Sequence, residues 1–356
     1  MEKVYDLHIH YTFDIPLEKT VEIFREEFKS TNTEKYCFLS IPYKLHGESV
    51  SLDDMQNLKA LCLKKSFSPN AYAFAGLEYD CEEGKLADSF LKQAKRYFSV
   101  GYDGIKMLEG YPSLLKARQI PLDSEIYDKY YGFMEQNGRP IIMHIANPEE
   151  NWNIASASPE AIAQGRIYDG SYPTKQQITN QAFSLMQKFP KLKLILAHFG
   201  FFSYNIEDAE RFLFFPNTAF DITPGGEQLI NMSKAWDKWL PFWQKYQDRI
   251  LYGTDLYAFP KNERWEISFN RRPSFLRQLL ETDKEHLYLG SEFKGIMLDE
   301  KLRDKIYRKN FLTLLGEPKN VDNEHILQEA KRLSLKKEHK SCTANEDIKY
   351  ILEEFK

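Results

Sequence analysis

The amino-acid sequence predicts an α/β fold, a (β/α)₈ TIM barrel with a C-terminal helical extension. Short β-rich segments alternate with amphipathic, helix-like segments about eight times along the chain, and the strand starts are evenly spaced apart from one gap. This alternation is typical of a parallel sheet, which either closes into a barrel or stays open as a doubly wound sheet. No GxGxxG turn follows the first strand segment, which disfavours a dinucleotide-binding open sheet.

Eight short β-rich runs are expected to form the strands of the barrel. Side chains alternate between the two faces of a strand. We therefore expect His8 and His10 to point one way and Leu7 and Ile9 the other. In chain order the expected strands cover residues 3–10, 34–42, 70–78, 103–109, 139–146, 192–200, 217–224 and 249–256.

Amphipathic segments lie between these runs, with apolar residues at helical spacing. The first has Pro16 near its first turn, and two others end in Asn-Gly or in proline, which are common helix stops. The expected helices cover residues 16–30, 52–65, 87–99, 124–138, 174–190 and 271–282.

Two stretches depart from the regular pattern. Residues 147–173 form a long polar connection in the irregular gap, and we expect it to be a substrate lid, because a barrel's active site is built from the loops after its strands. After about residue 316 the chain is charged and helix-prone, without strand signals. We therefore expect a barrel domain over residues 1–316 and a helical appendage over 317–356.

Composition excludes several classes of function. The chain has 356 residues, 42% of them hydrophobic, and a formal net charge of −4, so it carries no basic footprint for nucleic acid. We expect no membrane span and no signal peptide, because no apolar run is long enough and no basic segment precedes one. The four scattered cysteines form no CxxC pair and favour reduced thiols and a cytoplasmic location.

Four histidines and one aspartate occupy the ends of expected strands: His8, His10, His144, His198 and Asp255. The strand ends of a parallel barrel meet at one rim, so these side chains are expected to converge. The alternative interpretation is a set of hydrogen-bonded strand ends, with His198 as a core histidine. Four such histidines with an aspartate favour a metal site over that alternative.

Three imidazoles and a carboxylate suit a divalent metal ion, most of all Zn²⁺, with Mn²⁺ or Fe²⁺ as alternatives. Such a site keeps a position for water, whose pKa the metal lowers toward neutrality. A neighbouring carboxylate is then a candidate general base.

Five short motifs resemble the amidohydrolase superfamily: "DLHIH", "GIKM", "MHIA", "LAHFG" and "YGTD". They are most similar to the amidohydrolase-related, or amidohydrolase 2, branch. That branch also holds nonoxidative decarboxylases of the aminocarboxymuconate-semialdehyde and resorcylate types, and lactonases that act on pyrone dicarboxylates. The resemblance runs from about residue 4 to 316.

The resemblance implies a role for each motif residue. His8 and His10 match the HxH metal pair, His144 the third metal imidazole, and Asp255 the carboxylate that binds metal and serves as general base. His198 matches the histidine that polarises the substrate or shuttles a proton.

Lys106 matches the position of a carboxylated lysine in binuclear members, and of a substrate-facing side chain in this branch. The branch commonly has "GIKLHP" here, whereas this chain has "GIKMLEGYP", which adds Glu109 as a further carboxylate or rim charge. Asp221, on the seventh strand, either supports the metal site or is merely polar, and Asp6 caps or orients the first strand.

We therefore expect a metal-dependent hydrolase of a small carboxylated lactone, ester or amide. In this hypothesis a metal-activated water attacks the carbonyl carbon, Asp255 accepts the proton and His198 stabilises the developing oxyanion. Lys106, Arg166 and Tyr172 are expected to bind the substrate, although a solvated loop also explains the last two. The alternatives are a nonoxidative decarboxylase that uses the same residues and a barrel that binds metal or ligand without turnover. The small molecule is the only expected partner besides a homodimer, which rests on family analogy.

Overall fold

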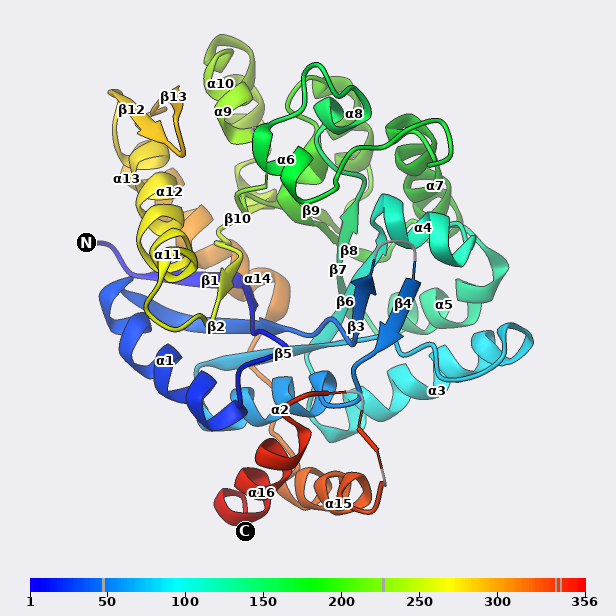
Figure 1. Cartoon of the computed structure of the whole chain (residues 1–356). Coiled ribbons are helices and arrows are strands. Elements are labelled where there is room, and N and C mark those ends of the chain that lie inside the picture. The colour runs from blue at the N-terminus through cyan, green and yellow to red at the C-terminus, as the bar shows by residue number, and fades with distance from the viewer. Residues whose placement is uncertain (47–48, 226–227, 337, 340) are drawn as a thin grey trace.

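The structure is a computed structural model that describes residues 1–46, 49–225, 228–336, 338–339 and 341–356 (Figure 1). Its centre is a sheet of parallel strands curled into a barrel, with helices around the outside. The strand order is β10-β9-β8-β7-β6-β5-β2-β1-β11. The bounds are β1 Val4–His10, β2 Thr33–Leu39, β5 Ala71–Gly76, β6 Gly104–Gly110, β7 Pro140–Ile145, β8 Lys193–Leu196, β9 Thr218–Asp221, β10 Ile250–Leu251 and β11 Leu256–Tyr257.

The eighth strand closes the barrel in two short pieces. Its first piece, β10, pairs with β9, and its second, β11, pairs with β1. Two residues between β10 and β11 also bind β1: the Leu7 N–H donates to Tyr252 O at 3.1 Å, and the Asp255 N–H donates to His8 O at 2.8 Å. The predicted TIM barrel is confirmed, and every expected strand segment contains a strand.

The six expected helices are all present, together with further helices that were not expected. The expected set is α1 Leu17–Ser30, α2 Gln56–Ser66, α3 Glu83–Val100, α5 Asp128–Gln136, α7 Lys175–Lys188 and α12 Arg272–Glu281. The additional helices are α4 Pro112–Arg118, α6 Pro159–Ala163, α8 Ile206–Leu213, α9 Gln228–Ser233, α10 Trp236–Lys245, α11 Glu263–Trp265, α13 Glu300–Asp304 and α14 Asn310–Leu315. Two antiparallel hairpins were not expected: β3 Tyr43–His46 with β4 Ser49–Leu52, and β12 Glu285–Tyr288 with β13 Ser291–Lys294.

The buried hydrophobic residues form two clusters, one inside the barrel and one between the sheet and the helices. The smaller one includes Leu7 and Ile142, which shares a strand face with His144, and Phe311 of α14 belongs to it. The larger one packs between the sheet and the helices and includes Ile9. The expectation that Leu7 and Ile9 share one face is therefore wrong. The pairing of β1 with β2 shifts register between Asp6 and Ile9, and a register shift moves side chains from one face to the other.

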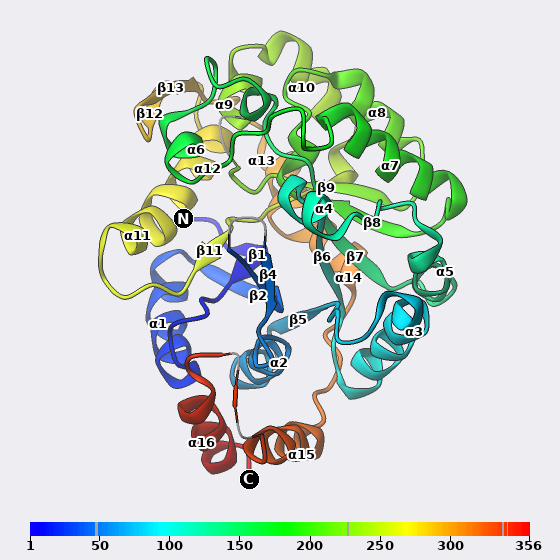
Figure 2. The same cartoon turned by 45° about the vertical axis from the view of Figure 1, so that its right-hand side comes forward.

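The last two helices, α15 Asn323–Ser334 and α16 Ala344–Glu354, lie together beside α2 (Figure 2). A fully buried ion pair joins them to the barrel, with Lys59 Nζ 3.0 Å from Asp347 Oδ2. Asp347 also accepts the Leu17 N–H at 2.6 Å at the start of α1. The C-terminal segment is thus docked, while a domain boundary at residue 316 stays a prediction. Among the described residues, no helix combines the length and apolarity needed to cross a membrane.

Candidate active site

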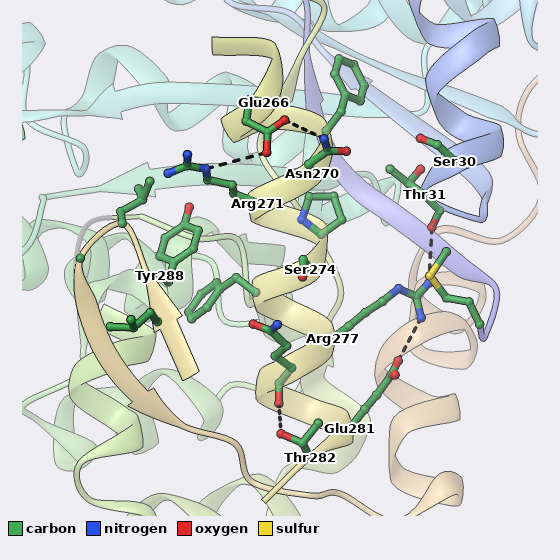
Figure 3. Close-up of a pocket in the computed structure, with 18 residues that line it drawn as sticks. Ser30, Thr31, Glu266, Asn270, Arg271, Ser274, Arg277, Glu281, Thr282 and Tyr288 are labelled. Carbon is green, nitrogen blue, oxygen red and sulfur yellow. Dashed lines mark hydrogen bonds and ion pairs between the residues drawn. The ribbon is translucent and has the colours of Figure 1, made fainter. Parts of the chain in front are cut away.

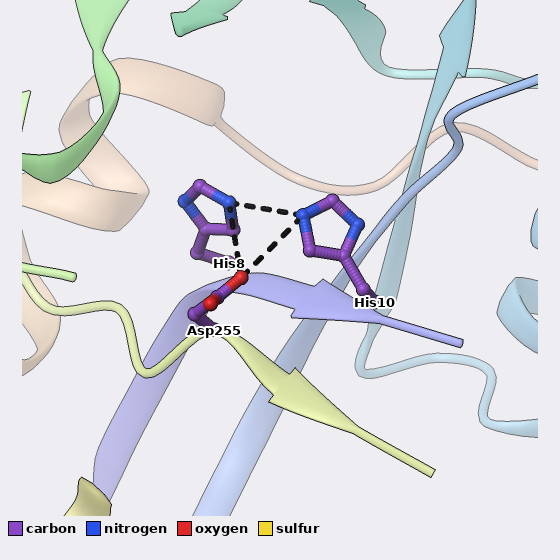
Figure 4. A group of neighbouring side chains, drawn as sticks. All are labelled: His8, His10 and Asp255. Carbon is purple, nitrogen blue, oxygen red and sulfur yellow. Dashed lines mark hydrogen bonds and ion pairs between the residues drawn. The ribbon is translucent and has the colours of Figure 1, made fainter. Parts of the chain in front are cut away.

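His8 and His10, on β1, come together with Asp255, which lies between the two pieces of the eighth strand (Figure 4). One ligand atom from each lies within 4.8 Å of the others. The two Nε2 atoms are 3.1 Å apart, and Asp255 Oδ1 is 3.8 Å from His8 Nε2 and 3.7 Å from His10 Nε2. Both imidazoles are buried. Two ligands about 2.0–2.1 Å from one tetrahedral ion are separated by roughly 3.3 Å, so the imidazole spacing suits a single cation.

The hydrogen bonds of these rings decide which nitrogen carries the proton. His8 Nδ1–H donates to Asp221 Oδ2 at 2.8 Å, and His10 Nδ1–H donates to Leu39 O at 2.9 Å. Both acceptors are oxygens without a proton of their own, so each Nδ1 must hold the hydrogen. Each Nε2 is left with a lone pair, and the two Nε2 atoms are 3.1 Å apart, so their lone pairs repel each other. Lys106 Nζ donates to the lone pair of His8 at 3.3 Å. A cation between the two Nε2 atoms removes this repulsion, so the donor set fits a metal ion.

Burial also keeps these rings uncharged. Desolvation lowers the pKa of His8 and of His10 well below the ordinary histidine value, and the positive charge of Lys106 lowers both further. Neutral imidazole is the form that binds metal. Protons therefore compete little for these two nitrogens at neutral pH.

His144 lies at the end of β7, outside the three-residue group. Its Nε2–H donates to Ala146 O at 2.9 Å, which leaves the lone pair on Nδ1. Desolvation lowers its pKa to about 3. Its ring centroid is 5.0 Å from that of His198. The structure thus brings together three of the four predicted ligands and places the fourth beside the sixth-strand histidine, and its role as a ligand stays a prediction.

His198 follows β8 in a tight turn, and not in the strand that was expected to reach residue 200. Its backbone is left-handed, with φ of 53°, and β8 ends at Leu196. Its Nδ1–H donates to Thr223 O at 3.3 Å, so Nε2 carries the lone pair. Its ring lies 5.2 Å from that of His8. In this protonation state Nε2 accepts a proton and has no hydrogen to donate to an oxyanion.

Two buried aspartates hold the histidine backbone and rings in place. Asp221 accepts the His8 ring proton, the His198 N–H at 2.8 Å and the Thr223 N–H at 3.1 Å. Asp6 accepts the His8 N–H at 3.0 Å, and Thr254 donates to it as well. Desolvation raises the pKa of Asp6 to about 7. Asp221 therefore orients a candidate ligand, which answers the question that the sequence left open.

Lys106 reaches the site from β6. Its Nζ lies 3.3 Å from His8 Nε2, and the side chain is buried. Desolvation lowers its pKa to about 8, although Asp221, Asp255 and Glu109 act in the opposite direction. Glu109 is held apart in a buried cluster, 3.5 Å from Arg118 and within hydrogen-bond distance of two tyrosine hydroxyls. It is not a free carboxylate at the rim.

The two predicted substrate residues of the long connection have different surroundings. Arg166 is exposed; burial raises the pKa of Asp255 and lowers that of His144, and the positive charge of Arg166 adds a lowering effect on both. Tyr172 instead packs against Tyr168 at 5.0 Å between ring centroids, with Lys116 Nζ 4.2 Å from its ring. These contacts hold Tyr172 against Tyr168 of the connection and Lys116 of α4.

Sequence reasoning missed Arg272, the first residue of α12. Its Nη1 lies 2.9 Å from Asp255 Oδ2 and also donates to the Asp255 backbone carbonyl. Burial raises the pKa of Asp255 to about 6, against the lowering effect of Arg272, Lys106 and Arg166. Arg272 belongs to none of the motifs, and its only sequence signal is its position in the helix that follows the eighth strand.

A cavity of about 740 Å³ lies elsewhere, between α12 and the β12–β13 hairpin (Figure 3). Its walls include Arg271, Arg277 and Tyr288, and none of the three grouped metal-ligand candidates lines it. The candidate metal site is thus separate from this cavity.

The chain matches a known family model and shares its fold with solved structures. The family model described as amidohydrolase matches residues 90–316, more than half of the chain. No curated protein sequence matches it. Solved structures share the fold at low identity. A TIM-barrel protein from Bordetella bronchiseptica is 14% identical with a TM-score of 0.54, covering 88% of this chain and 99% of that chain.

Two enzymes are similar to a comparable degree. The 2,6-dihydroxybenzoate decarboxylase from Rhizobium is 16% identical with a TM-score of 0.53, covering 88% of this chain and 99% of its own. The 4-oxalomesaconate hydratase from Rhodopseudomonas palustris is 13% identical with a TM-score of 0.53, covering 93% of this chain and 98% of its own. The family match, supported by the shared fold, establishes that this chain belongs to the amidohydrolase family.

Proposed function

We propose that the protein is a metal-dependent hydrolase of a small carboxylated lactone, ester or amide. The observation that carries the proposal is the pair of Nε2 atoms of His8 and His10, which each hold a lone pair and lie 3.1 Å apart beside Asp255 Oδ1. His8, His10 and Asp255 would hold the ion, with His144 as a further candidate ligand. We propose Zn²⁺, because two imidazoles and a carboxylate suit it, and Mn²⁺ or Fe²⁺ fit the same donors.

A divalent ion at this position supplies Lewis acidity and lowers the pKa of water. The chain's own residues then move protons. Asp255 presents Oδ1 toward the imidazoles, where one lone pair of this oxygen would hold the ion and the other is the candidate base. The Nε2 lone pair of His198 accepts a proton, so we assign His198 the shuttle role in place of the oxyanion role expected from the sequence.

Positive side chains define the substrate that we propose. Lys106 is buried next to His8, and the charge of Arg166 acts on Asp255 and His144. Both favour a substrate with a carboxylate near the reacting bond. The site is buried, which favours a small molecule.

A nonoxidative decarboxylase is the second candidate. His198 lies outside the grouped metal-ligand candidates and carries a lone pair on Nε2, so once that nitrogen has taken up a proton it can deliver the proton to carbon while Asp255 holds the ion. Replacement of CO₂ by hydrogen requires a proton donor at carbon, whereas hydrolysis requires one at the leaving oxygen or nitrogen.

One experiment separates these reactions. The full-length protein, metal-free and reconstituted with Zn²⁺ or Mn²⁺, is incubated with carboxylated lactones, esters and amides and with hydroxylated aromatic acids. Metal-dependent release of a new carboxylic acid supports the hydrolase, and metal-dependent release of CO₂ supports the decarboxylase. Bound metal without turnover of any compound contradicts both and favours a binding protein.

A further inference from the structure

Asp255 is held at three points, and two of them belong to one arginine. Its N–H donates to His8 O at 2.8 Å. Arg272 Nη1 contacts both the Asp255 backbone carbonyl and Asp255 Oδ2, the latter at 2.9 Å. The residue also has a left-handed φ of 57°, which a non-glycine residue keeps only where its surroundings enforce it.

These contacts give the two carboxylate oxygens of Asp255 different partners. Oδ2 faces the guanidinium, while Oδ1 faces the imidazoles of His8 and His10 at 3.8 and 3.7 Å. A free carboxylate rotates and offers a cation either one oxygen or both. With Oδ2 engaged by a rigid guanidinium, only Oδ1 remains for the cation.

Arg272 is itself fixed by the elements around it. A π-helix, Glu266–Arg271, leads directly into α12, and such segments are frequent at functional sites. Ser268, within this π-helix, binds the Tyr257 N–H at 2.7 Å and donates to Tyr257 O at 3.1 Å. The hydroxyl of Tyr288 is hydrogen-bonded to the Arg272 guanidinium from the β12–β13 side. The π-helix therefore binds Tyr257 through Ser268, and the start of α12 binds Asp255 through Arg272.

We propose that Arg272 is a positioning residue that restricts Asp255 to one metal-binding oxygen and so biases the site toward Zn²⁺ over Mn²⁺. The inference rests on the proposed metal-dependent function. Zn²⁺ prefers four ligands, whereas Mn²⁺ prefers six and gains more from a second carboxylate oxygen. A one-oxygen aspartate therefore disfavours Mn²⁺ relative to Zn²⁺.

The charge of Arg272 also repels any cation, and this effect must be separated from positioning. Both ions are divalent, so the repulsion acts on them alike and cancels in the ratio of their dissociation constants. The ratio therefore reports the coordination that Asp255 allows.

The test measures Zn²⁺ binding by competition with a chromophoric chelator and Mn²⁺ binding by electron paramagnetic resonance. Metal-free full-length wild type, Arg272→Met, Arg272→Lys and Arg271→Met are compared. Arg271 is the matched control, because it is the preceding residue, half-exposed and 4.0 Å from Glu266. We expect Arg272→Met to lower the ratio of the Mn²⁺ to the Zn²⁺ dissociation constant about tenfold, within the range usual for residues that orient a ligand. The ratio for Arg272→Lys should lie between those of the wild type and Arg272→Met, because an ammonium lacks the planar fork of a guanidinium. The ratio for Arg271→Met should match that of the wild type.

The visible spectrum of bound Co²⁺ is the second readout, and a purely structural role would leave it unchanged. We expect Arg272→Met to show the weaker bands of a higher coordination number. A folded Arg272→Met variant with an unchanged ratio and an unchanged spectrum overturns the inference. If that variant does not fold, Arg272→Lys and Tyr288→Phe decide by the same criteria. A wild-type protein that binds neither ion overturns the proposed function itself, a result distinct from equal binding by wild type and variant.

Discussion

The Nδ1–H of His8 donates to Asp221 across 213 positions of the sequence, at 2.8 Å between two fully buried side chains. This bond holds the His8 proton on Nδ1 and turns the Nε2 lone pair toward His10 and Asp255. Most of the candidate chemistry depends on it, because an imidazole in the other tautomer has no lone pair to offer at that point.

Replacing Asp221 by asparagine should weaken metal binding while the protein stays folded. The amide keeps the shape but loses the charge that selects the His8 tautomer, so we expect a 10–100-fold rise in the dissociation constant for Zn²⁺. Competition with a chelator measures it. Asp237→Asn, at an exposed position on α10, is the control and should bind like the wild type. Equal affinity in both variants would contradict the orienting role of Asp221.

Metal affinity should fall in acid. In the metal-free protein burial raises the pKa of Asp255 to about 6, while the pKa values of His8 and His10 lie well below the ordinary value. Above pH 6 the carboxylate is ready to bind, and below pH 6 the cation must displace one proton. We expect an affinity loss of about tenfold per pH unit below pH 6. Calorimetric titrations with Mn²⁺ from pH 5 to 7.5 measure this slope, and a flat profile would remove Asp255 from the ligand set.

Lys106→Met should tighten cation binding. Its ammonium lies 3.3 Å from His8 Nε2, and the Coulomb repulsion of a cation there is worth about tenfold or more in affinity. The wild-type affinity should also rise as pH passes about 8, because Lys106 loses its charge there, and the variant should lack this rise. If the lysine binds a substrate carboxylate, KM rises in the same variant. Weaker metal binding by Lys106→Met would instead make the lysine, or a derivative of it, part of the metal site.

Lys59→Met should destabilise the whole chain through the docked C-terminal segment. The Lys59–Asp347 pair is fully buried, so removal of the lysine leaves an uncompensated carboxylate, at a cost of about 3–5 kcal/mol. Urea unfolding followed by circular dichroism gives the free energy of unfolding. The double variant Lys59→Met/Asp347→Leu should recover part of the loss. Lys19→Met removes an exposed pair with Glu22 and should change stability by about 0.5 kcal/mol at most.

Local sequence patterns predicted the barrel and the order of its chemistry-bearing residues. The strand runs that carry His8, His10 and Asp255 near their ends were enough to predict that these residues meet, because closure of a parallel barrel brings the strand ends to one rim. The same patterns placed His198 at the site but in a strand. They could not show that residues 198–200 take left-handed backbone conformations, with φ of 53° to 60°, because that turn depends on tertiary packing.

Other features depended on contacts that no local pattern records. The register shift in β1 separates Leu7 from Ile9, although strict alternation places them together. The Nε2 of His144 is engaged by Ala146 O, which leaves the lone pair on Nδ1, and the ring lies outside the grouped three. Arg272 stands in a helix of ordinary composition, and only the folded chain brings it to Asp255.

The claim that one divalent ion binds between His8, His10 and Asp255 is tested most directly by crystallography of the full-length protein loaded with Zn²⁺. Anomalous difference maps above and below the zinc edge locate the metal. We expect one strong peak about 2.0–2.2 Å from Nε2 of His8, Nε2 of His10 and Oδ1 of Asp255. No peak there, or a zinc ion bound elsewhere while the two Nε2 atoms stay in direct contact, would contradict this claim.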